Sequence, residues 1–399
     1  APAVVFIAKE RGGDRPAPAT LTPATLLHLA DTWLLAMPIP SAKSPAWRVE
    51  QVHQQGKQSF PGRTAALAQA LRDAKAGKAG LLDKTEHKAF SGGVRQLAKL
   101  DIRNANLLLA ADINGDKKPD LLVNSPTGGA RVFLAGADGV YRDATKTWCP
   151  FGVVSPYAAF GDVNGDSKPD FLQNGTIWLN TGSGFAAKAT MEIPPKVRPL
   201  AAALADVNAD GRADAILLAA SGELRVYENP GHTDAPWKAL PARTVWTGGE
   251  APAAATIGDF GDDSRPHILA VWPGRVARFG IAADSPASAE YEQMTGEPLT
   301  KYHKSYKDGL KNILATAIDI NGDGRRDLFI LADGGGMMMI NRGYGAFMVD
   351  PAAGGELFGS DRRKVPFTLM SRTPWTAADP AGQKCENLLI LTPDGILYQ

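Results

Sequence analysis

Four nine-residue segments place carboxylate and carboxamide side chains at alternating positions. They are DINGDKKPD at 112–120, DVNGDSKPD at 162–170, DVNADGRAD at 206–214 and DINGDGRRD at 319–327. In the first segment, oxygen ligands are available from Asp112, Asn114, Asp116, the Lys118 carbonyl and Asp120. Such a set suits a hard cation such as calcium, and the carboxylates would repel one another without a counter-ion. The pattern therefore predicts a calcium-binding loop.

The spacing also resembles half of an EF-hand, and the sequence tests this alternative. An EF-hand needs a bidentate glutamate at position 12 and a helix on each side of the loop. Position 12 is Val123, Gln173, Leu217 and Ile330 in the four segments, and each lies in a strand-like apolar run. The loops are therefore predicted to connect β-strands.

Two weaker copies complete a repeat pattern. They are DFGDDSRPH at 259–267 and DPAGQKCEN at 379–387, so that the first positions fall at 112, 162, 206, 259, 319 and 379. A run of small apolar residues precedes most copies, and a hydrophobic strand, a glycine-containing turn and further strands follow. Intervals of 44 to 60 residues with four strands each are typical of propeller blades. The fold class is predicted to be all-β, a β-propeller of six or seven four-stranded blades, with seven favoured.

The stretches AAFGDVNGDSKPDFL and ATAIDINGDGRRDLFIL give the repeat a family resemblance. Residues 100–399 resemble the FG-GAP/VCBS repeats found in integrin alpha-chain propellers and in many bacterial exported proteins. The resemblance implies about four structural Ca²⁺ sites, each in the hairpin between the first two strands of a blade. The implied ligands are Asp112, Asn114, Asp116 and Asp120; Asp162, Asn164, Asp166 and Asp170; Asp206, Asn208, Asp210 and Asp214; and Asp319, Asn321, Asp323 and Asp327.

The copy at 259–267 departs from this pattern. Gly261 replaces the asparagine and His267 replaces the last acid, so Asp259 and Asp263 are not expected to hold a metal tightly. The copy at 379–387 has lost nearly all of its ligands.

Residues 1–100 contain no acidic loop and form a separate, partly helical segment in this interpretation, ahead of a propeller over 101–399. Helical spacing appears at 22–37 and 62–77, and strand-like patterns appear at 4–10 and 46–54. The last repeat ends after two or three strands. Because closing a ring removes exposed sheet edges, Val4–Ala8 or Trp47–His53 is expected to supply the closing strand.

The composition limits the classes of partner. The 43 basic and 42 acidic residues give a net charge of +1, which argues against a nucleic-acid partner. No apolar run approaches the length needed to span a bilayer. The first residues, APAVV, fit an end left by a signal peptidase and equally fit a trimmed chain; of the two we expect export, to a secreted, periplasmic or cell-surface location.

The other reactive residues give weaker signals. Cys149 and Cys385 are either two buried thiols or one disulfide. The six histidines do not lie at metal-ligand spacing, and no nucleophile elbow or phosphate loop is present. The segment KYHKSYKDG at 301–309 is a solvated loop, a lid or a sugar-binding loop. The tryptophans Trp148, Trp178, Trp237, Trp246 and Trp272 are expected to pack between blades rather than to bind sugars.

Three functions remain open at this stage. The first is a non-enzymatic, calcium-stabilised module for adhesion or binding to a protein or glycan. The second is a polysaccharide lyase on a propeller scaffold, for which His303, Tyr302 and Tyr306 are the candidate groups. The third is a subunit of a larger cell-surface assembly that docks through residues 1–100.

Overall fold

A computed structural model describes a part of the chain that includes most of its repeats. The described residues are 34–36, 50–52, 96–152, 154, 157–193, 198–231, 235–246, 249–260, 265–273, 275–281, 291–294, 313–319, 325–332, 335–341, 347–350, 369–373 and 386–398. The predictions for residues 4–10, 62–77 and 301–309, and those for Cys385, therefore lie outside the described residues.

A two-stranded antiparallel sheet lies in the N-terminal segment. It pairs β1 (Leu34–Ala36) with β2 (Glu50–Val52). The helix predicted over 22–37 is therefore wrong at its end, where Leu34–Ala36 pairs with a partner strand. The apolar spacing of this stretch also fits a short strand, and the pairing with β2 favours the strand over the helix.

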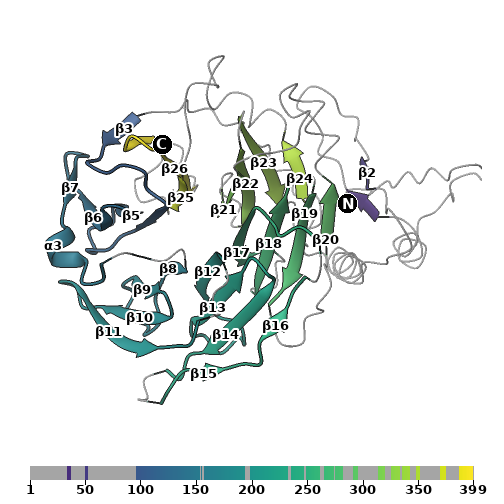
Figure 1. Ribbon diagram of the computed structural model, residues 1–399, viewed down its shortest axis with the longest axis horizontal. Helices are drawn as coiled ribbons and strands as arrows, with labels where there is room; N and C mark the ends of the chain where they lie inside the picture. The colour runs from purple at the N-terminus through teal and green to yellow at the C-terminus, as the bar shows by residue number, and fades with distance from the viewer. Residues whose placement is uncertain are drawn as a thin grey trace, which may run out of the picture.

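Six larger antiparallel sheets make up the rest of the described chain (Figure 1). The first contains β4 (Leu107–Ala111), β5 (Asp120–Ser125), β6 (Gly129–Ala135) and β7 (Tyr141–Asp143). A short helix, α3 (Thr145–Trp148), follows it. The second sheet contains β8 (Ala158–Gly161), β9 (Asp170–Gln173), β10 (Thr176–Asn180) and β11 (Phe185–Thr190). The third contains β12 (Pro199–Ala205), β13 (Asp214–Ala219), β14 (Glu223–Glu228), β15 (Lys238–Ala239) and β16 (Arg243–Thr244).

The remaining three sheets repeat the same order of strands. The fourth contains β17 (Ala254–Asp259), β18 (Pro266–Trp272), β19 (Arg275–Gly280) and β20 (Tyr291–Met294). The fifth contains β21 (Leu314–Ile318), β22 (Asp327–Ala332), β23 (Gly335–Asn341) and β24 (Phe347–Asp350). The sixth contains β25 (Leu369–Thr373), β26 (Asn387–Leu391), β27 (Ile396–Tyr398) and β3 (Gln96–Lys99).

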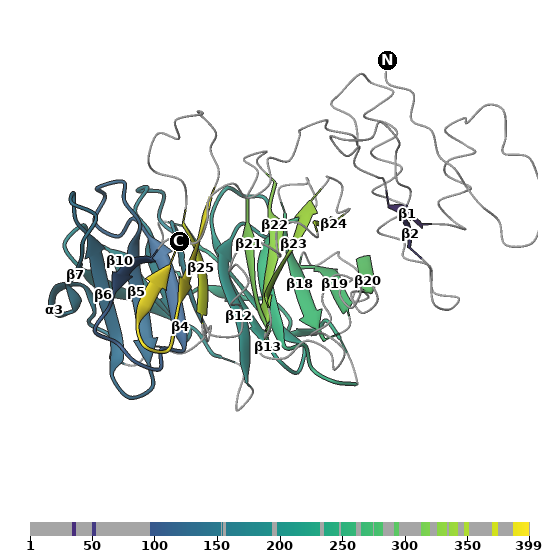
Figure 2. The same cartoon turned by 90° about the horizontal axis from the view of Figure 1, so that it is seen from above.

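The first strands of these sheets surround a common axis. In sequence order β4, β8, β12, β17, β21 and β25 each contact the next one, and β25 contacts β4 (Figures 1 and 2). The described strands therefore form a closed cycle of six sheets, and they give no support to the preference for seven blades. All-β sheets arranged radially in this way form a β-propeller, as the sequence predicted.

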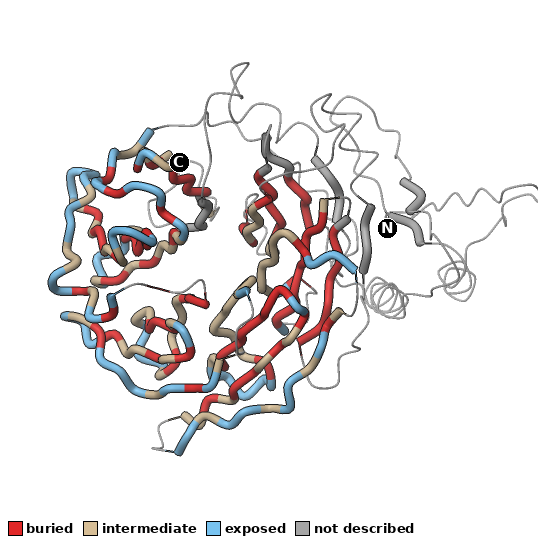
Figure 3. The backbone as a smooth tube through the Cα atoms, viewed as in Figure 1, coloured by how far each residue is buried: buried red, intermediate tan, exposed pale blue. Residues whose placement is uncertain are grey.

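The burial pattern explains why these residues form such sheets. The second strands β5, β13 and β18 are buried along their whole length, because a neighbouring sheet covers each face (Figure 3). Their sequences are nearly continuous apolar runs, which suits strands buried on both sides. The four position-12 residues lie in second strands, in agreement with the prediction that the loops join β-strands.

The strand that closes the ring differs from both candidates. It is β3, whose residues Lys99, Ala98 and Gln96 pair with Ile396, Leu397 and Tyr398 of β27. Of the candidate Trp47–His53, the described residues Glu50–Val52 instead form β2 of the small N-terminal sheet. The segment directly before the first sheet can reach the last sheet with the shortest connection, which explains why β3 takes this place.

Aromatic side chains fill the space between neighbouring sheets. Trp148 packs edge-on against Phe185, with 5.9 Å between ring centroids, and Trp246 packs in the same way against Trp272 at 5.9 Å. The rings of Phe151 and Trp178 lie 5.2 Å apart. These four tryptophans therefore pack between blades, as expected.

Two further observations concern the cysteines and the membrane. Cys149 is a half-buried free thiol whose Sγ lies 3.6 Å from the Ala130 carbonyl oxygen, so it forms no disulfide. Within the described ranges, no helix has the length and apolar character required to cross a bilayer.

Candidate metal centre

The three acidic loops that are described in full share one backbone conformation. Positions 4 and 6 are left-handed in each: φ is 79° at Gly115 and 64° at Lys117 in the first loop. The same pair has 79° and 64° at Gly165 and Ser167, and 63° and 82° at Ala209 and Gly211. Non-glycine residues adopt this region at a cost, so its recurrence indicates that other contacts hold the loop.

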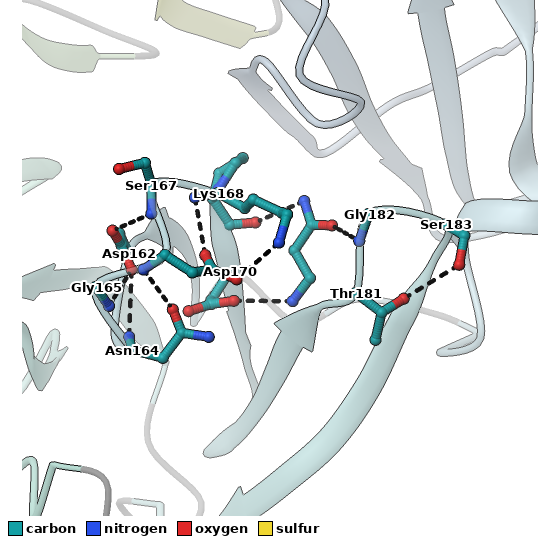
Figure 4. A network of polar contacts seen from close by, with 12 residues as sticks. Asp162, Asn164, Gly165, Ser167, Lys168, Asp170, Thr181, Gly182 and Ser183 are labelled. Carbon is teal, nitrogen blue, oxygen red and sulfur yellow. Dashed lines mark hydrogen bonds and ion pairs between the residues drawn. The ribbon is translucent and has the colours of Figure 1, made fainter.

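Those contacts come from the side chains at positions 1, 3 and 5 (Figure 4). In the second loop, Asp162 Oδ2 accepts the N–H of Ser167 at 2.8 Å. Asn164 Oδ1 accepts the N–H of Asp166 at 3.0 Å, and Asp166 Oδ1 accepts the N–H of Lys168 at 2.9 Å. The first and third loops repeat these bonds through Asp112, Asn114 and Asp116, and through Asp206, Asn208 and Asp210. The loop backbone thus curls around these side-chain oxygens.

The atoms that could bind a metal in these loops suit a hard cation. All side-chain candidates are oxygens, and Asp112 Oδ1 is buried without a hydrogen-bond partner. A buried carboxylate oxygen without a partner is costly unless a cation or water satisfies it. In the described part of the chain, however, no three His, Cys, Asp or Glu side chains gather closely enough to hold a metal by themselves. The asparagine and carbonyl oxygens would have to complete each site, and the calcium sites stay a prediction.

A cationic side chain at position 7 lies beside each loop. Lys118 Nζ is 3.3 Å from Asp116 Oδ2, Lys168 Nζ is 2.9 Å from Asp166 Oδ2, and an Arg212 nitrogen is 2.5 Å from Asp210 Oδ2. From the sequence, position 7 was expected to contribute only its carbonyl oxygen. These exposed ion pairs offset part of the loop charge, at about 0 to 1 kcal/mol each.

The carboxylate at position 9 has a different surrounding from the others. Asp120, Asp170 and Asp214 are fully buried. In each case Oδ2 accepts the N–H of position 2, at 2.9 to 3.0 Å. The other oxygen, Oδ1, accepts an N–H at or just after the end of the third strand at 2.8 Å. This residue therefore ties the hairpin to the third strand of its own sheet.

Burial also changes the acidity of these carboxyl groups. Desolvation raises the pKa of Asp120 to about 6, although the N–H groups of Ala135, Asn114 and Ile113 act in the opposite direction. The pKa values of Asp170 and Asp214 are raised by burial as well. A bound cation would favour the charged form and oppose this shift.

An asparagine at or next to the end of the third strand connects each loop to its neighbour. Asn180 Nδ2 donates to the carbonyl of Ile113 at 2.9 Å, and Asn229 Nδ2 donates to the carbonyl of Val163 at 2.8 Å. Asn341 Nδ2 makes the same contact with Phe260 at 3.5 Å. These asparagines were not predicted from the sequence, although their recurrence in TIWLN, VYEN and MMIN was a visible signal.

The fourth set of predicted ligands is only partly described. Asp327 is buried, and its Oδ1 accepts the N–H of Asn341 at 2.8 Å, as in the other loops. The Asp319 N–H donates to Glu386 Oε2 at 3.0 Å. Asn321 and Asp323 lie outside the described residues, as does Asp263 in the weaker copy, where Asp259 is exposed and His267 is buried.

The fold and its loops define the class of this protein as a β-propeller with acidic hairpin loops. Within it, residues 112–172 match the FG-GAP-like repeat family, which confirms the family resemblance of this part of the chain. The matched residues span the first two acidic loops. No curated protein sequence matches the chain.

Several solved structures are similar in fold at low identity. A lectin from Agrocybe aegerita, described as recognising non-reducing terminal N-acetylglucosamine, is 16% identical over 72% of this chain and 75% of its own, with a TM-score of 0.47. The Photorhabdus luminescens Tc holotoxin pore is 17% identical over 63% of this chain and 12% of its own, with a TM-score of 0.39. BBS1N in complex with ARL6DN is 10% identical over 77% of this chain and 94% of its own, with a TM-score of 0.40. Because identities and scores are low, these similarities carry no argument about function.

Proposed function

We propose that the protein is a calcium-stabilised β-propeller that acts as a binding or adhesion module for a protein or a glycan, at a secreted, periplasmic or cell-surface location. The observation that carries this proposal is the repeated acidic loop, in which hydrogen bonds from the loop backbone hold the side-chain oxygens in place. An FG-GAP-like repeat over residues 112–172 supports it.

Calcium would serve structure in this proposal. The ligands would come from positions 1, 3, 5 and 9 and from the carbonyl at position 7 of each loop, and the ion would supply charge neutralisation. Extracellular modules bind calcium with dissociation constants of roughly 10⁻⁴ to 10⁻³ M, so each site adds about 0.5 to 1.5 kcal/mol at millimolar calcium. Four such sites together would be comparable to the stability of a domain.

If the acidic loops serve structure, a binding function must lie elsewhere on the propeller. The side-chain oxygens at positions 1, 3, 5 and 9 accept hydrogen bonds from backbone N–H groups, and in this proposal their remaining lone pairs bind the ion. These groups hold the architecture, which leaves the surfaces between and outside the blades for a partner. Fold alone does not define a ligand, so the proposal requires a direct binding measurement.

A glycan array together with a pull-down from the native organism tests the proposal, both in millimolar calcium and in a chelator. We expect a glycan or a protein to be retained in calcium and to be lost when the chelator destabilises the propeller. Cleavage of acidic polysaccharides by the purified protein would overturn the proposal in favour of the lyase alternative. Retention of no glycan and no protein in calcium would also overturn it.

A further inference from the structure

A cavity of about 610 Å³ lies between the second and third sheets. One wall comes from β10, β11 and the residue Asn164 of the second acidic loop, and the other from Tyr227 of β14 and the described residues of 229–231 and 235–237. This volume falls within the range of small-molecule sites, which is roughly 300 to 1,000 Å³. The cavity shares Val163, Asn164 and Asn229 with the contacts that hold the second and third acidic loops.

Buried hydrogen bonds fix the two walls relative to each other. Asn229 donates to the carbonyl of Val163 in the facing wall at 2.8 Å, and its Oδ1 accepts the N–H of Gly231 at 2.9 Å. The Tyr227 hydroxyl donates to the carbonyl of Glu192 across the cavity. The cavity is therefore formed before any ligand arrives, which lowers the entropic cost of binding.

The lining combines an aromatic ring with hydrogen-bonding groups. Trp237 is half-buried and packs against the apolar cluster of Ile177 and Tyr227. Lys188 and Thr190 are exposed and contribute an ammonium and a hydroxyl from β11. A sugar ring has one apolar C–H face and a rim of hydroxyls, so it matches a site with an indole on one side and polar groups on the other.

The charges of the lining narrow the class of ligand. Lys188 and Glu192 carry opposite charges, and Arg225, which lies 3.5 Å from Glu192, is also paired with Glu223 at 2.7 Å. The described lining thus has no excess of either sign that would favour an ionic ligand. We propose that this cavity binds a neutral saccharide, with Trp237 as the ring that stacks on the sugar and Lys188 as a donor to its hydroxyls. This inference rests on the proposed function, because it names a glycan site within the binding module.

The test uses the full chain in millimolar calcium and follows tryptophan fluorescence and calorimetry. The probes are the methyl glycosides of glucose, galactose, mannose and N-acetylglucosamine, with glucuronic acid as the charged comparison. We expect at least one neutral glycoside to bind, and Trp237→Ala to weaken its binding about tenfold, which corresponds to about 1.4 kcal/mol. Trp246→Phe is the matched control, because Trp246 packs between the third and fourth sheets, and it should bind like the wild type.

A second variant protects the test against misfolding of Trp237→Ala. Lys188 is exposed, so Lys188→Ala should fold normally and weaken the same glycoside several-fold, while the exposed Lys146→Ala on α3 should have no effect. If a neutral glycoside binds and both cavity variants retain its full affinity, the site is elsewhere; this inference fails, and the proposed function stands. If only glucuronic acid binds, the neutral class is wrong. If none of the probes binds while the array or pull-down finds a partner, the inference also fails and the proposed function again stands.

Discussion

Asn180 Nδ2 lies 2.9 Å from the carbonyl oxygen of Ile113, 67 residues earlier in the chain, and donates a hydrogen bond to it. The backbone N–H of the same asparagine donates to Asp170 Oδ1 at 2.8 Å. One buried residue therefore links the last carboxylate of the second acidic loop to the backbone of the first. The acidic loops are parts of one network that joins neighbouring blades.

Replacing this asparagine should destabilise the propeller. Asn180→Ala removes the bonds to the carbonyls of Ile113 and Pro169 and leaves both without that donor in a buried or partly buried setting. We expect a loss of about 1 to 3 kcal/mol in the free energy of unfolding, measured by urea denaturation.

Asn180→Asp provides a close comparison, because it keeps the size of the side chain and removes only the donor. It should be at least as destabilised as the alanine variant, since it adds a buried charge. The exposed Lys146→Ala should change stability by less than about 0.5 kcal/mol. An unaltered stability of both Asn180 variants would contradict a role for this contact between blades.

The repeated hairpins were predictable because their signal is local. The D-x-N-G-D spacing and the apolar residue at position 12 both lie within one short stretch, and they located the first two strands of each blade. The role of Asn180 was not predictable in the same way, because its partner Ile113 is set by the angle between two blades. The contact of the Lys168 side chain with Asp166 was missed for a local reason, since it depends on how the loop backbone curls.

The closing strand shows the limit of local patterns more clearly. Gln96–Lys99 is a four-residue strand with exposed ends, and its partner Ile396–Tyr398 lies about 300 residues away. Val4–Ala8, one of the two segments predicted to close the ring, is more apolar than Gln96–Lys99. Ring closure depends on which segment lies close enough to the open edge of the last sheet, and the sequence pattern alone does not show this.

Removal of β3 should leave the sixth sheet with an open edge. A chain that starts at residue 101 loses the pairing of Lys99, Ala98 and Gln96 with β27, together with the buried Leu100, whose N–H donates to the Gly395 carbonyl at 2.7 Å. We expect its free energy of unfolding to fall by at least about 2 kcal/mol. We also expect it to aggregate, which size-exclusion chromatography would detect.

A chain that starts at residue 96 is the control, because it keeps β3 and lacks only the residues before it. Its melting temperature should exceed that of the chain starting at 101. Equal melting temperatures for the two truncated chains would show that β3 contributes nothing to closure.

Removal of calcium should lower the melting temperature. If four loops each gain about 0.5 to 1.5 kcal/mol from millimolar calcium, then excess chelator should lower it by roughly 5 to 15 °C, measured by calorimetry. A change within one or two degrees would contradict a structural role for the ion.

Asp162→Ala separates the ion from general effects of the chelator. It removes one ligand of the second loop and should reduce the calcium-dependent part of the stabilisation by about a quarter. Asp138→Ala, which lies on an exposed turn and pairs with Arg142, is the matched acidic control and should leave the calcium-dependent part unchanged.

The buried carboxyl of Asp120 should make the calcium-free protein respond to pH in a defined direction. Its pKa in the folded protein is raised to about 6, above the usual value of about 4 in an unfolded chain. Between these values the folded state binds more protons than the unfolded state, so this group's contribution to stability is present below pH 4 and is lost as the pH rises through 6. Urea unfolding in chelator at pH 5 and pH 7.5 measures the difference in stability, and Asp120→Asn should reduce this difference because the asparagine does not titrate.

With calcium the trend should reverse, since the ion requires charged ligands and its stabilisation is lost on acidification. Equal pH responses of the wild type and Asp120→Asn in chelator would contradict the raised pKa.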